Sequence, residues 1–396
     1  MENIQKRIEC SQVRWDKGEC RKKFGIEKED HICLWIADSD LPLDEKINKY
    51  LENRIKYPYY GYTTLDKKFE ESFLDYHKKH RNQTIKMEEV FFTPGTVVSF
   101  SHVVRAISKK QDGIAMCTPI YGPLFQVSEA LQRRVEKIPL LNKNERFYLD
   151  FEKIEETIKQ KDIKIFVIVN PLNPSGRVWE RSELEKLVEI CKKYNVYIIS
   201  DEIHCDLVYE GKAFTSMLEF EKTYNRFIVL TSVNKTFNIA GVQVGWGIVK
   251  NKEILELINI KLDQSHIKCV PNIFAQALME GCFKEGDDFI KESMNLYKTN
   301  YDWLKNYLNE NANELTVMEM DSTFLPYICF KRTGISLEEM KDVLWNKAKV
   351  IVQFNDDFVD GGCTYFRINV ATDFKIIQEA AKRICNVINE YKGMEK

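Results

Sequence analysis

The chain has 396 residues, a formal net charge of −2 and a hydrophobic content of 44%. This length predicts either two to three domains or one large α/β body with an appendage, and the apolar content is sufficient for a sizeable core. Because the charge is near balance and lysines alternate with glutamates, nothing indicates nucleic acid or an anionic membrane as the main partner. No apolar run reaches membrane-spanning length.

The N-terminal residues 1–15 are polar and lack the apolar segment of a secretory leader. The eleven cysteines form no C-x-x-C pair, and none is grouped with histidines at metal-ligand spacing. Five of them stand among apolar residues, where a free thiol packs as a small hydrophobe: Cys33, Cys117, Cys191, Cys269 and Cys385. We therefore expect a reduced, cytoplasmic protein without a metal site.

Helix-like and strand-like segments alternate through the middle of the chain. A Pro-Gly turn at 94–95 leads into a helix, and residues 180–195 repeat apolar side chains at helical spacing. Four segments rich in apolar residues are expected to be strands: 164–170, 196–200, 226–232 and 242–249. Continuous β-branched runs are typical of strands that are covered on both faces. The alternation predicts a three-layer α/β/α fold with a mainly parallel sheet.

The pattern changes beyond Pro271. A long polar helical segment occupies roughly 282–311, and Ser336 with Glu339 forms a capping box at the start of a later helix. Strands expected at 323–330 and 364–372 and a terminal amphipathic helix complete a smaller α/β domain. We predict an N-terminal segment at 1–45 that belongs to this small domain, a large domain at 46–281 and the small domain itself at 282–396.

Three polar residues follow three of the predicted strands. Asn173 comes after the first strand, Asp201 after the second and Lys235 after the third. Ligands of open parallel sheets bind beyond the carboxyl ends of the strands, so an amide, a carboxylate and an amine are expected in one crevice. Lysine is rarely buried without a reason, which favours a chemical role for Lys235.

A phosphate site is expected at the same crevice. Gly95 and Thr96 begin a helix whose first N–H groups and dipole suit an anion, and Ser232 adds a hydroxyl. Together with Tyr121, which could stack on a ring, these groups suit pyridoxal 5′-phosphate. In this hypothesis Lys235 forms the Schiff base, and a carboxylate keeps the pyridine nitrogen protonated.

Each of these residues also has a structural explanation. A lysine past a strand is compatible with a solvent-facing loop, and Asp201 could cap the following helix. Tyr121 stands in a Tyr-Gly-Pro turn, His204 could be a core histidine, and Arg367 could be an exposed strand residue or an ion-pair partner. Only the order and spacing of the set favour a shared site.

Three motifs, NPLNPSGR, SDEIHCDLV and TSVNKTFNIAG, occur in an order and at separations similar to those of fold-type I pyridoxal-phosphate enzymes, the aspartate aminotransferase superfamily. The resemblance runs from about Trp35 to Arg367. The segments LWIADSD, SDEIH and NKTFNIAG most resemble the carbon–sulfur β-lyase branch, the MalY/PatB-type cystathionine β-lyases. Aminotransferases more often have tyrosine at His204 and an arginine shortly after the lysine, which is absent here.

The resemblance implies a role for each matching residue. Lys235 is the Schiff-base lysine and Asp201 pairs with the pyridine nitrogen. The remaining roles cover the cofactor ring, its phosphate and the substrate: Asn173 and His204 at the phenolic oxygen, Tyr121 on the ring, Gly95, Thr96, Val97 and Ser232 around the cofactor with its phosphate, Tyr62 from the partner subunit of a homodimer, and Arg367, Ala37, Asp38 and Asn173 on the substrate side.

Several positions depart from the pattern of the branch. Leu172 and Asn234 replace histidine and serine, and Ser39 and Leu41 replace methionine and phenylalanine. None of them belongs to the set that is expected to hold the cofactor. Ser39 and Leu41 lie near the expected mouth of the substrate site, so the substrate preference is left open.

The leading hypothesis is α,β-elimination on an S-substituted cysteine such as cystathionine, which yields a thiol, pyruvate and ammonia. Lys235 would take the Cα proton, with a pKa lowered by burial. The alternative is an aminotransferase on the same scaffold, in which the lysine returns the proton to the cofactor. A regulatory role through protein–protein contacts also stays open, whereas the chain has no helix-turn-helix pattern or basic stripe for DNA.

Overall fold

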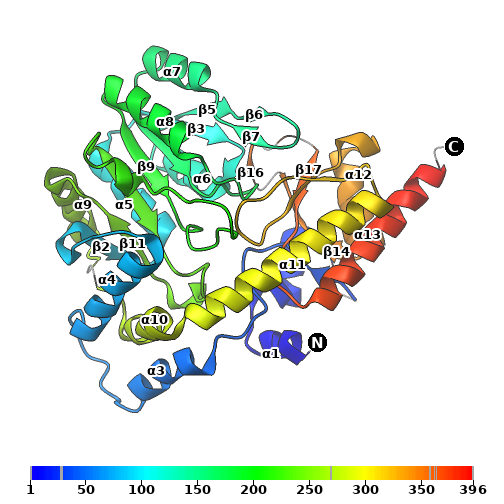
Figure 1. The fold of residues 1–396 in the computed structure, drawn as a ribbon, viewed down its shortest axis with the longest axis horizontal. Helices are drawn as coiled ribbons and strands as arrows, with labels where there is room; N and C mark the ends of the chain where they lie inside the picture. Colours follow the sequence, from blue (N-terminus) through cyan, green and yellow to red (C-terminus); the bar gives the residue numbers. More distant parts are fainter. Residues whose placement is uncertain are drawn as a thin grey trace.

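The computed structural model describes residues 2–26, 30–267, 270–355, 358–360, 362 and 364–394. Cys269, one of the cysteines noted above, lies outside the described residues. Figure 1 shows a sheet with its covering helices on the left and a smaller group of helices and strands on the right. The long helix α11 (Asp287–Asn311) runs from one part to the other.

A seven-stranded sheet forms the centre of the larger part. Its strands follow the order β2 (Val90–Thr93), β11 (Gly245–Ile248), β10 (Phe227–Thr231), β9 (Tyr197–Asp201), β8 (Ile163–Val169), β3 (Gly113–Thr118) and β5 (Arg134–Pro139). The five strands from β10 to β5 are mutually parallel, whereas β11 is antiparallel to both of its neighbours. All residues of β3 and β10 are buried, as expected for strands covered on both faces.

Helices cover both faces of this sheet (Figure 1). The helices of this part are α3 (Glu45–Ile55), α4 (Lys67–Arg81), α5 (Thr96–Ile107), α6 (Gly122–Ala130), α7 (Phe151–Gln160), α8 (Arg181–Lys193), α9 (Lys252–Gln264) and α10 (Ile273–Glu285), of which α3 packs against α10 and not on the sheet itself. The helices predicted to follow the turn at 94–95 and to span 180–195 are α5 and α8. The predicted α/β fold with a mainly parallel sheet is confirmed.

The smaller part contains an antiparallel sheet of short strands. Its order is β12 (Thr316–Val317), β13 (Tyr327–Cys329), β17 (Tyr365–Arg367) and β15 (Gln353–Phe354), and α11, α12 (Leu337–Asp342), the π turn η6 (Val343–Lys347) and α13 (Phe374–Met394) lie in the same part. The predicted capping box is present, because Ser336 and Glu339 bond each other's backbone groups at the start of α12.

The N-terminal residues form α1 (Glu2–Glu9), the 3₁₀ turn η1 (Val13–Trp15) and α2 (Lys17–Phe24). Strand β1 (Ile32–Cys33) then pairs in parallel with β14 (Val350–Ile351) of the smaller part. The remaining short elements are β4 (Ile120–Tyr121), β6 (Leu141–Asn142), β7 (Phe147–Tyr148), β16 (Phe358–Val359), η2 (Met87–Glu89), η3 (Met217–Phe220), η4 (Ala240–Val242) and η5 (Lys331–Thr333).

Two large groups of buried apolar side chains form the core. One extends from Ile47 to Tyr327 in the sequence and fills the space around the seven-stranded sheet. The other extends from Leu34 to Ile388 and lies mainly between α11, α13 and the small sheet. The domain boundaries 1–45, 46–281 and 282–396 stay a prediction. No helix of the described segments is both long and apolar enough to cross a membrane.

Several predicted elements differ from the structure, and the strands expected at 323–330 and 364–372 are reduced to the three residues of β13 and of β17. The helical segment expected at 282–311 is divided, since α10 ends at Glu285 and α11 begins after Gly286. A Cβ on Gly286 would lie 2.4 Å from the Phe237 ring. Glycine at the junction of the two helices therefore allows this ring to pack against the backbone. The strand expected at 242–249 is only β11, because Gln243 before it has a left-handed φ of 52°.

Candidate active site

A cavity of about 360 Å³ lies at the carboxyl ends of β8, β9 and β10. It is lined by side chains from both parts of the molecule and from the N-terminal segment: Lys23, Trp35, Ile36, Ala37, Thr96, Val97, Tyr121, Pro123, Gln126, Val169, Asn173, Asp201, Ile203, His204, Lys235, Gln353 and Arg367. The expected convergence of an amide, a carboxylate and an amine past three strands is therefore present.

Lys235 is partly buried in this cavity, and its amine donates a hydrogen bond to the carbonyl oxygen of Ala37 at 2.6 Å. Burial lowers the pKa of Lys235 to about 8. The charge of Arg367 acts in the same direction, whereas the carboxylates of Asp38 and Asp201 oppose it. An amine with this pKa is neutral in an appreciable fraction near neutral pH, as a nucleophile or general base requires.

Asp201 ends β9 and is only 5% exposed. Burial raises the pKa of Asp201 to about 6, and the bond that it accepts from the backbone N–H of Ile203 and the Lys235 charge oppose the shift. A buried carboxylate with so few partners favours a cationic group beside it. The protonated nitrogen of a pyridine ring is such a group.

His204 is 2% exposed, and burial together with the Lys235 and Arg367 charges lowers its pKa to about 3. The imidazole is therefore neutral. Its Nδ1 is buried and has no hydrogen-bond partner among the described residues. A buried polar atom without a partner is costly, so this nitrogen at the cavity wall is available to a bound molecule.

The N-terminus of α5 opens into the cavity through Thr96 and Val97. Gly95 caps this helix with a φ of 137°, a conformation that favours glycine, and a Cβ added there would meet no atom within 4 Å. Gly245 of β11 lets the helix end come close, since its Cβ would lie 2.6 Å from the Thr96 nitrogen. The first N–H groups of α5 thus form an open cradle that suits a phosphate.

Arg367 of β17 forms the opposite wall. Its Nη1 donates to Asn173 Oδ1 at 2.8 Å, and its Nη2 donates to the Trp35 carbonyl oxygen at 3.3 Å and to Gln353 Oε1. Only 3% of the residue is exposed. A buried guanidinium held by neutral oxygens keeps its charge for an anionic ligand such as a carboxylate.

Tyr121 closes the site from the side of α6. It is paired with Phe358 across the β4–β16 ladder, and burial raises its pKa, as does the Asp201 charge. The phenol therefore stays protonated around neutral pH. Its position on the cavity wall is compatible with the predicted stacking on a cofactor ring.

Four predicted site residues lie outside the cavity lining, and the first of them is Gly95, which caps α5 beside it. Ser232 Oγ donates to the Val244 carbonyl oxygen at 2.8 Å, and Asp38 forms an ion pair with Arg7 at 2.5 Å. Tyr62 is 98% exposed and lies beside a different hollow. The roles of all four in binding cofactor or substrate stay predictions.

The departures from the lyase branch are also placed by the structure. Ser39 is buried and exchanges backbone hydrogen bonds with the Asn238 side chain, while Leu41 packs into the core. Leu172 is buried, and Asn234 bonds the Val244 carbonyl oxygen. Neither Ser39 nor Leu41 lines the cavity, although Ala37 of the same segment does, so their influence on the substrate stays a prediction.

Sequence reasoning missed several lining residues: Lys23, Pro123, Gln126, Ile203 and Gln353. Gln353 is the cross-strand neighbour of Arg367, but β15 has only two residues and leaves no alternation to read. Lys23 comes from the last turn of α2, far from the motifs in the sequence. Ile203 stands between Asp201 and His204, and Pro123 follows Tyr121 by two residues, so neighbouring site residues could have indicated both.

A family model described as aminotransferase class I and II matches residues 40–384. The chain belongs to this family. The relative named cystathionine beta-lyase PatB, from Bacillus subtilis (strain 168), is 28% identical over 382 residues, which cover 96% of this chain and 97% of the relative. The superfamily that the sequence motifs resemble is thereby confirmed.

Two solved members of this fold are similar over almost the whole chain. A PLP-bound protein of Clostridium difficile 630, provisionally described as an aminotransferase, has a TM-score of 0.92 and 32% identity, covering 97% of this chain and 98% of that one. Cystalysin from Treponema denticola, whose structure contains pyridoxal 5′-phosphate, has a TM-score of 0.92 and 25% identity, with 97% of each chain covered.

Proposed function

We propose that this protein is a pyridoxal-phosphate-dependent carbon–sulfur β-lyase that cleaves cystathionine or related S-substituted L-cysteines. The cofactor is pyridoxal 5′-phosphate, as expected from the sequence, and PLP-bound relatives support it. The lyase relatives PatB and cystalysin support the reaction type. The observation that carries the proposal is a partly buried Lys235 amine with a pKa of about 8 in the same cavity as Asp201 and Arg367.

The residues of the cavity suit distinct parts of the cofactor. The N-terminus of α5 would hold the phosphate, Asp201 the pyridine nitrogen, and Asn173 with His204 the phenolic oxygen. When bound, the cofactor supplies an electron sink for the negative charge that develops at the substrate Cα. The open space above Gly95 and the unpartnered Nδ1 of His204 are consistent with this fit.

The chain's own groups then bind the substrate and move its proton. Arg367 would bind the α-carboxylate and fix the orientation of the Cα–H bond. Lys235, in its neutral form, would take the proton from Cα. As the Cα electron pair forms the new double bond to Cβ, the Cβ–S bond breaks and the thiolate leaves. Hydrolysis of the remaining three-carbon unit gives pyruvate and ammonia.

The experiment is a product analysis with purified protein, pyridoxal phosphate and cystathionine. Wild type is expected to release pyruvate and a thiol in equal amounts when no keto acid has been added as an amino-group acceptor. Lys235→Ala should lose at least about 10³-fold in rate, because it removes both the nucleophile and the base. Lys222→Ala, on an exposed position, is the matched control. Absence of pyruvate from every S-substituted cysteine tested would overturn the proposal.

A second candidate function is amino-group transfer. It is favoured by the similarity to the Clostridium difficile protein described provisionally as an aminotransferase. In that reaction, Lys235 would return the proton to the cofactor and a keto acid would accept the amino group. Strict dependence of turnover on 2-oxoglutarate, with no pyruvate formed from S-methyl-L-cysteine, would select this alternative.

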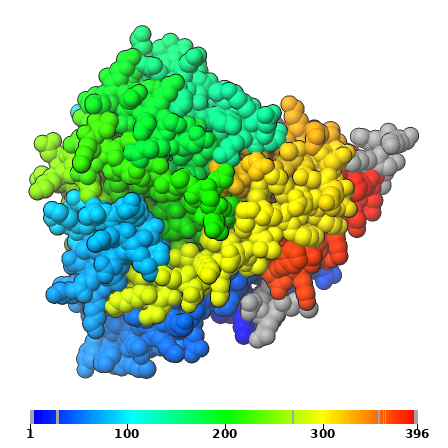
Figure 2. Space-filling model, viewed as in Figure 1, coloured from blue at the N-terminus to red at the C-terminus, as the bar shows by residue number. Residues whose placement is uncertain are grey.

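A homodimer is part of the proposal. Four tyrosines in the loop after α3 are strongly exposed: Tyr57 at 66%, Tyr59 at 78%, Tyr60 at 56% and Tyr62 at 98%. This part of the chain lies at the lower left edge of the molecule in Figures 1 and 2, beside a hollow of about 700 Å³. Clustered surface aromatics are typical of protein interfaces, and a second copy of the chain is the proposed occupant.

Mixed dimers test whether Tyr62 reaches the partner's active site. Tyr62→Ala and Lys235→Ala proteins, each inactive or nearly so, would be unfolded and refolded together. In a symmetric dimer with shared sites, about a quarter of the sites receive both native residues, so activity should return to about that level. If the mixture stays as inactive as its components while sedimentation shows dimers, Tyr62 acts within its own subunit.

A further inference from the structure

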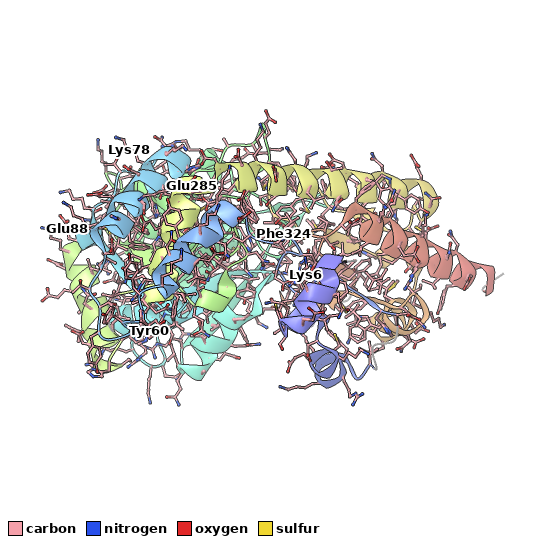
Figure 3. The ribbon with its side chains drawn as sticks, turned by 90° about the horizontal axis from the view of Figure 1, so that it is seen from below. Lys6, Tyr60, Lys78, Glu88, Glu285 and Phe324 are labelled. Atoms are coloured by element: carbon pink, nitrogen blue, oxygen red, sulfur yellow. The ribbon has the colours of Figure 1, made fainter. Side chains whose placement is uncertain are left out.

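The N-terminal helix α1 is bound to the loop 36–40 that borders the cavity. Arg7 Nη1 donates to the Ser39 carbonyl oxygen at 2.7 Å and to Asp40 Oδ1, and Nη2 donates to Asp38 Oδ2 at 2.5 Å. The Arg7 side chain is only 11% exposed. Figure 3, seen from below, shows α1 with its labelled Lys6 near the middle of the molecule. An almost buried arginine that donates to three acceptors indicates a specific structural contact and not a solvated surface charge.

A second arginine reinforces the same loop. Arg14 is fully buried; its Nε donates to the Cys33 carbonyl oxygen at 2.7 Å, and its Nη1 lies 3.7 Å from Asp38 and 3.5 Å from Asp40. Burial raises the pKa of Asp40, but the Arg14 and Arg7 charges more than offset it, so the net pKa is lowered. Two arginines and two aspartates thus form one cluster on the N-terminal side of the loop.

The other side of the loop is held by amides. Asn238 Nδ2 donates to the Ser39 carbonyl oxygen at 2.8 Å and its Oδ1 accepts from the Ser39 N–H at 3.0 Å. Asn369 Nδ2 donates to the carbonyl oxygens of Ile36 at 2.5 Å and Asp38 at 2.7 Å. The Ala37 carbonyl, which accepts from the Lys235 amine, therefore has fixed neighbours on both sides.

We propose that Arg7, supported by Arg14, is a positioning residue of the active site: by binding Asp38 and Asp40 it holds the Ala37 carbonyl against the Lys235 amine and neutralises the Asp38 charge beside it. The inference builds on the proposed function, in which Lys235 carries the proton. It assigns a task to α1, a helix that contributes no residue to the cavity lining.

The sign of the electrostatic effect follows from the groups around Lys235. Asp38 and Asp201 favour the charged amine, and Arg367 opposes it. His204 also faces the lysine and is neutral. Arg7 and Arg14 face Asp38 and oppose its effect. Removal of the Arg7 charge should therefore raise the pKa of Lys235, whereas removal of the Asp38 charge should lower it.

The test compares Arg7→Gln with Asp38→Asn in the full chain freed of cofactor. Trace acetylation over a range of pH, with mass spectrometry of the Lys235 peptide, reports the neutral fraction of this amine. At pH 7, Arg7→Gln should lower the labelling of Lys235 by about threefold to tenfold, and Asp38→Asn should raise it by a similar factor. Both variants break the same ion pair, so loss of structure alone cannot produce opposite shifts. Arg7→Lys should restore most of the wild-type value.

The cofactor-loaded protein gives a second readout. The pH midpoint of the visible absorption band should move upward in Arg7→Gln and downward in Asp38→Asn. Lys22→Gln, which removes an exposed positive charge from the same segment, should leave both readouts unchanged. Shifts of equal sign in the two variants, or no shift in either, would overturn the proposal. Neither readout requires turnover, so such a result would leave the lyase activity to be judged by pyruvate formation alone.

Discussion

Arg81 and Asp206 form a two-bond ion pair in the interior of the protein. The arginine Nε and Nη2 donate to Asp206 Oδ1 and Oδ2, both at 2.7 Å, and the two side chains are 2% and 4% exposed. Asp206 also accepts from the Tyr76 hydroxyl at 3.0 Å and from the Thr236 hydroxyl at 2.9 Å. Since Thr236 follows Lys235 in the chain, this pair ties α4 to the loop that carries the reactive amine.

Replacement of Arg81 by methionine should strongly destabilise the fold. It leaves the buried Asp206 carboxylate without its cation, and breaking such a pair costs about 3–5 kcal/mol. Chemical unfolding followed by tryptophan fluorescence measures the change. Arg181→Met is the matched control, because that side chain is 52% exposed and its loss should leave the unfolding midpoint almost unchanged. Equal midpoints for the two variants would contradict a structural role of the pair.

The same pair predicts how wild-type stability depends on acid. Burial raises the pKa of Asp206, but the charge and hydrogen bonds of Arg81 outweigh it, and the pKa falls to about 2. A lowered folded-state pKa contributes stability that is complete above the ordinary value of 3.8 and is lost as the pH falls through 2. Unfolding measured at a series of acid pH values should show this loss of stability in wild type and not in Asp206→Asn. The unfolding midpoint of the variant should therefore change less between pH 4 and pH 2.

Much of the site could be predicted because it depends on strand ends. The apolar runs of β8, β9 and β10 are continuous and end at polar residues, so local patterns placed Asn173, Asp201 and Lys235 at one edge of the sheet. Parallel strands deliver their carboxyl ends to the same side, which converts a one-dimensional pattern into a spatial one.

The rest depends on contacts that leave no local pattern. The acceptor of the Lys235 amine is the backbone oxygen of Ala37, nearly 200 positions away in the chain, and any residue type would provide it. Gln353 faces Arg367 because of the register of two very short strands. The hydroxyl of Ser232 bonds a backbone carbonyl, which its neighbours in sequence do not indicate. Long-range register and backbone acceptors lie beyond single-sequence reasoning.

Asp201→Asn should stabilise the protein when no cofactor is bound. Burial raises the pKa of Asp201 to about 6, so the folded state binds the proton more tightly than the unfolded state does. The contribution is favourable at low pH and is lost as the pH rises from 3.8 through 6. Above pH 6 the free energy of unfolding of the variant should exceed that of wild type by on the order of 3 kcal/mol, and below pH 4 the two free energies should be the same.

The pH-dependent unfolding of cofactor-free protein measures this effect. Glu256→Gln, at an exposed position of α9, is the control and should change nothing. With pyridoxal phosphate added, the order should reverse, because only the wild-type carboxylate can pair with a cationic ring nitrogen. If Asp201→Asn is less stable than wild type at pH 7 without cofactor, burial of the Asp201 carboxylate does not destabilise the folded state.

Cofactor uptake should report the lowered pKa of Lys235. The amine reacts only in its neutral form, and burial brings its pKa to about 8. The rate at which cofactor-free protein develops the visible band should therefore rise with pH and level off above about 8. With a lysine of ordinary pKa, the rate of cofactor uptake would continue to rise up to about pH 10. Lys235→Ala should develop no such band, and a rate that still rises at pH 10 would place the reactive amine in water.

Arg367→Lys should weaken substrate binding more than it slows the chemical step. Lysine keeps the charge but loses the planar fork that binds a carboxylate through two bonds, and its head cannot keep the contacts to Asn173 and Gln353. KM for S-methyl-L-cysteine should rise by about 10- to 100-fold, equivalent to about 1–3 kcal/mol, with a smaller loss in kcat. Arg383→Lys on α13, which pairs with Glu379 at the surface, is the control.

The decisive comparison is with S-methylcysteamine, which lacks the carboxylate: its affinity, measured as inhibition, should be the same in wild type and Arg367→Lys. A parallel loss of affinity for both compounds would mean that Arg367 shapes the cavity without binding the carboxylate.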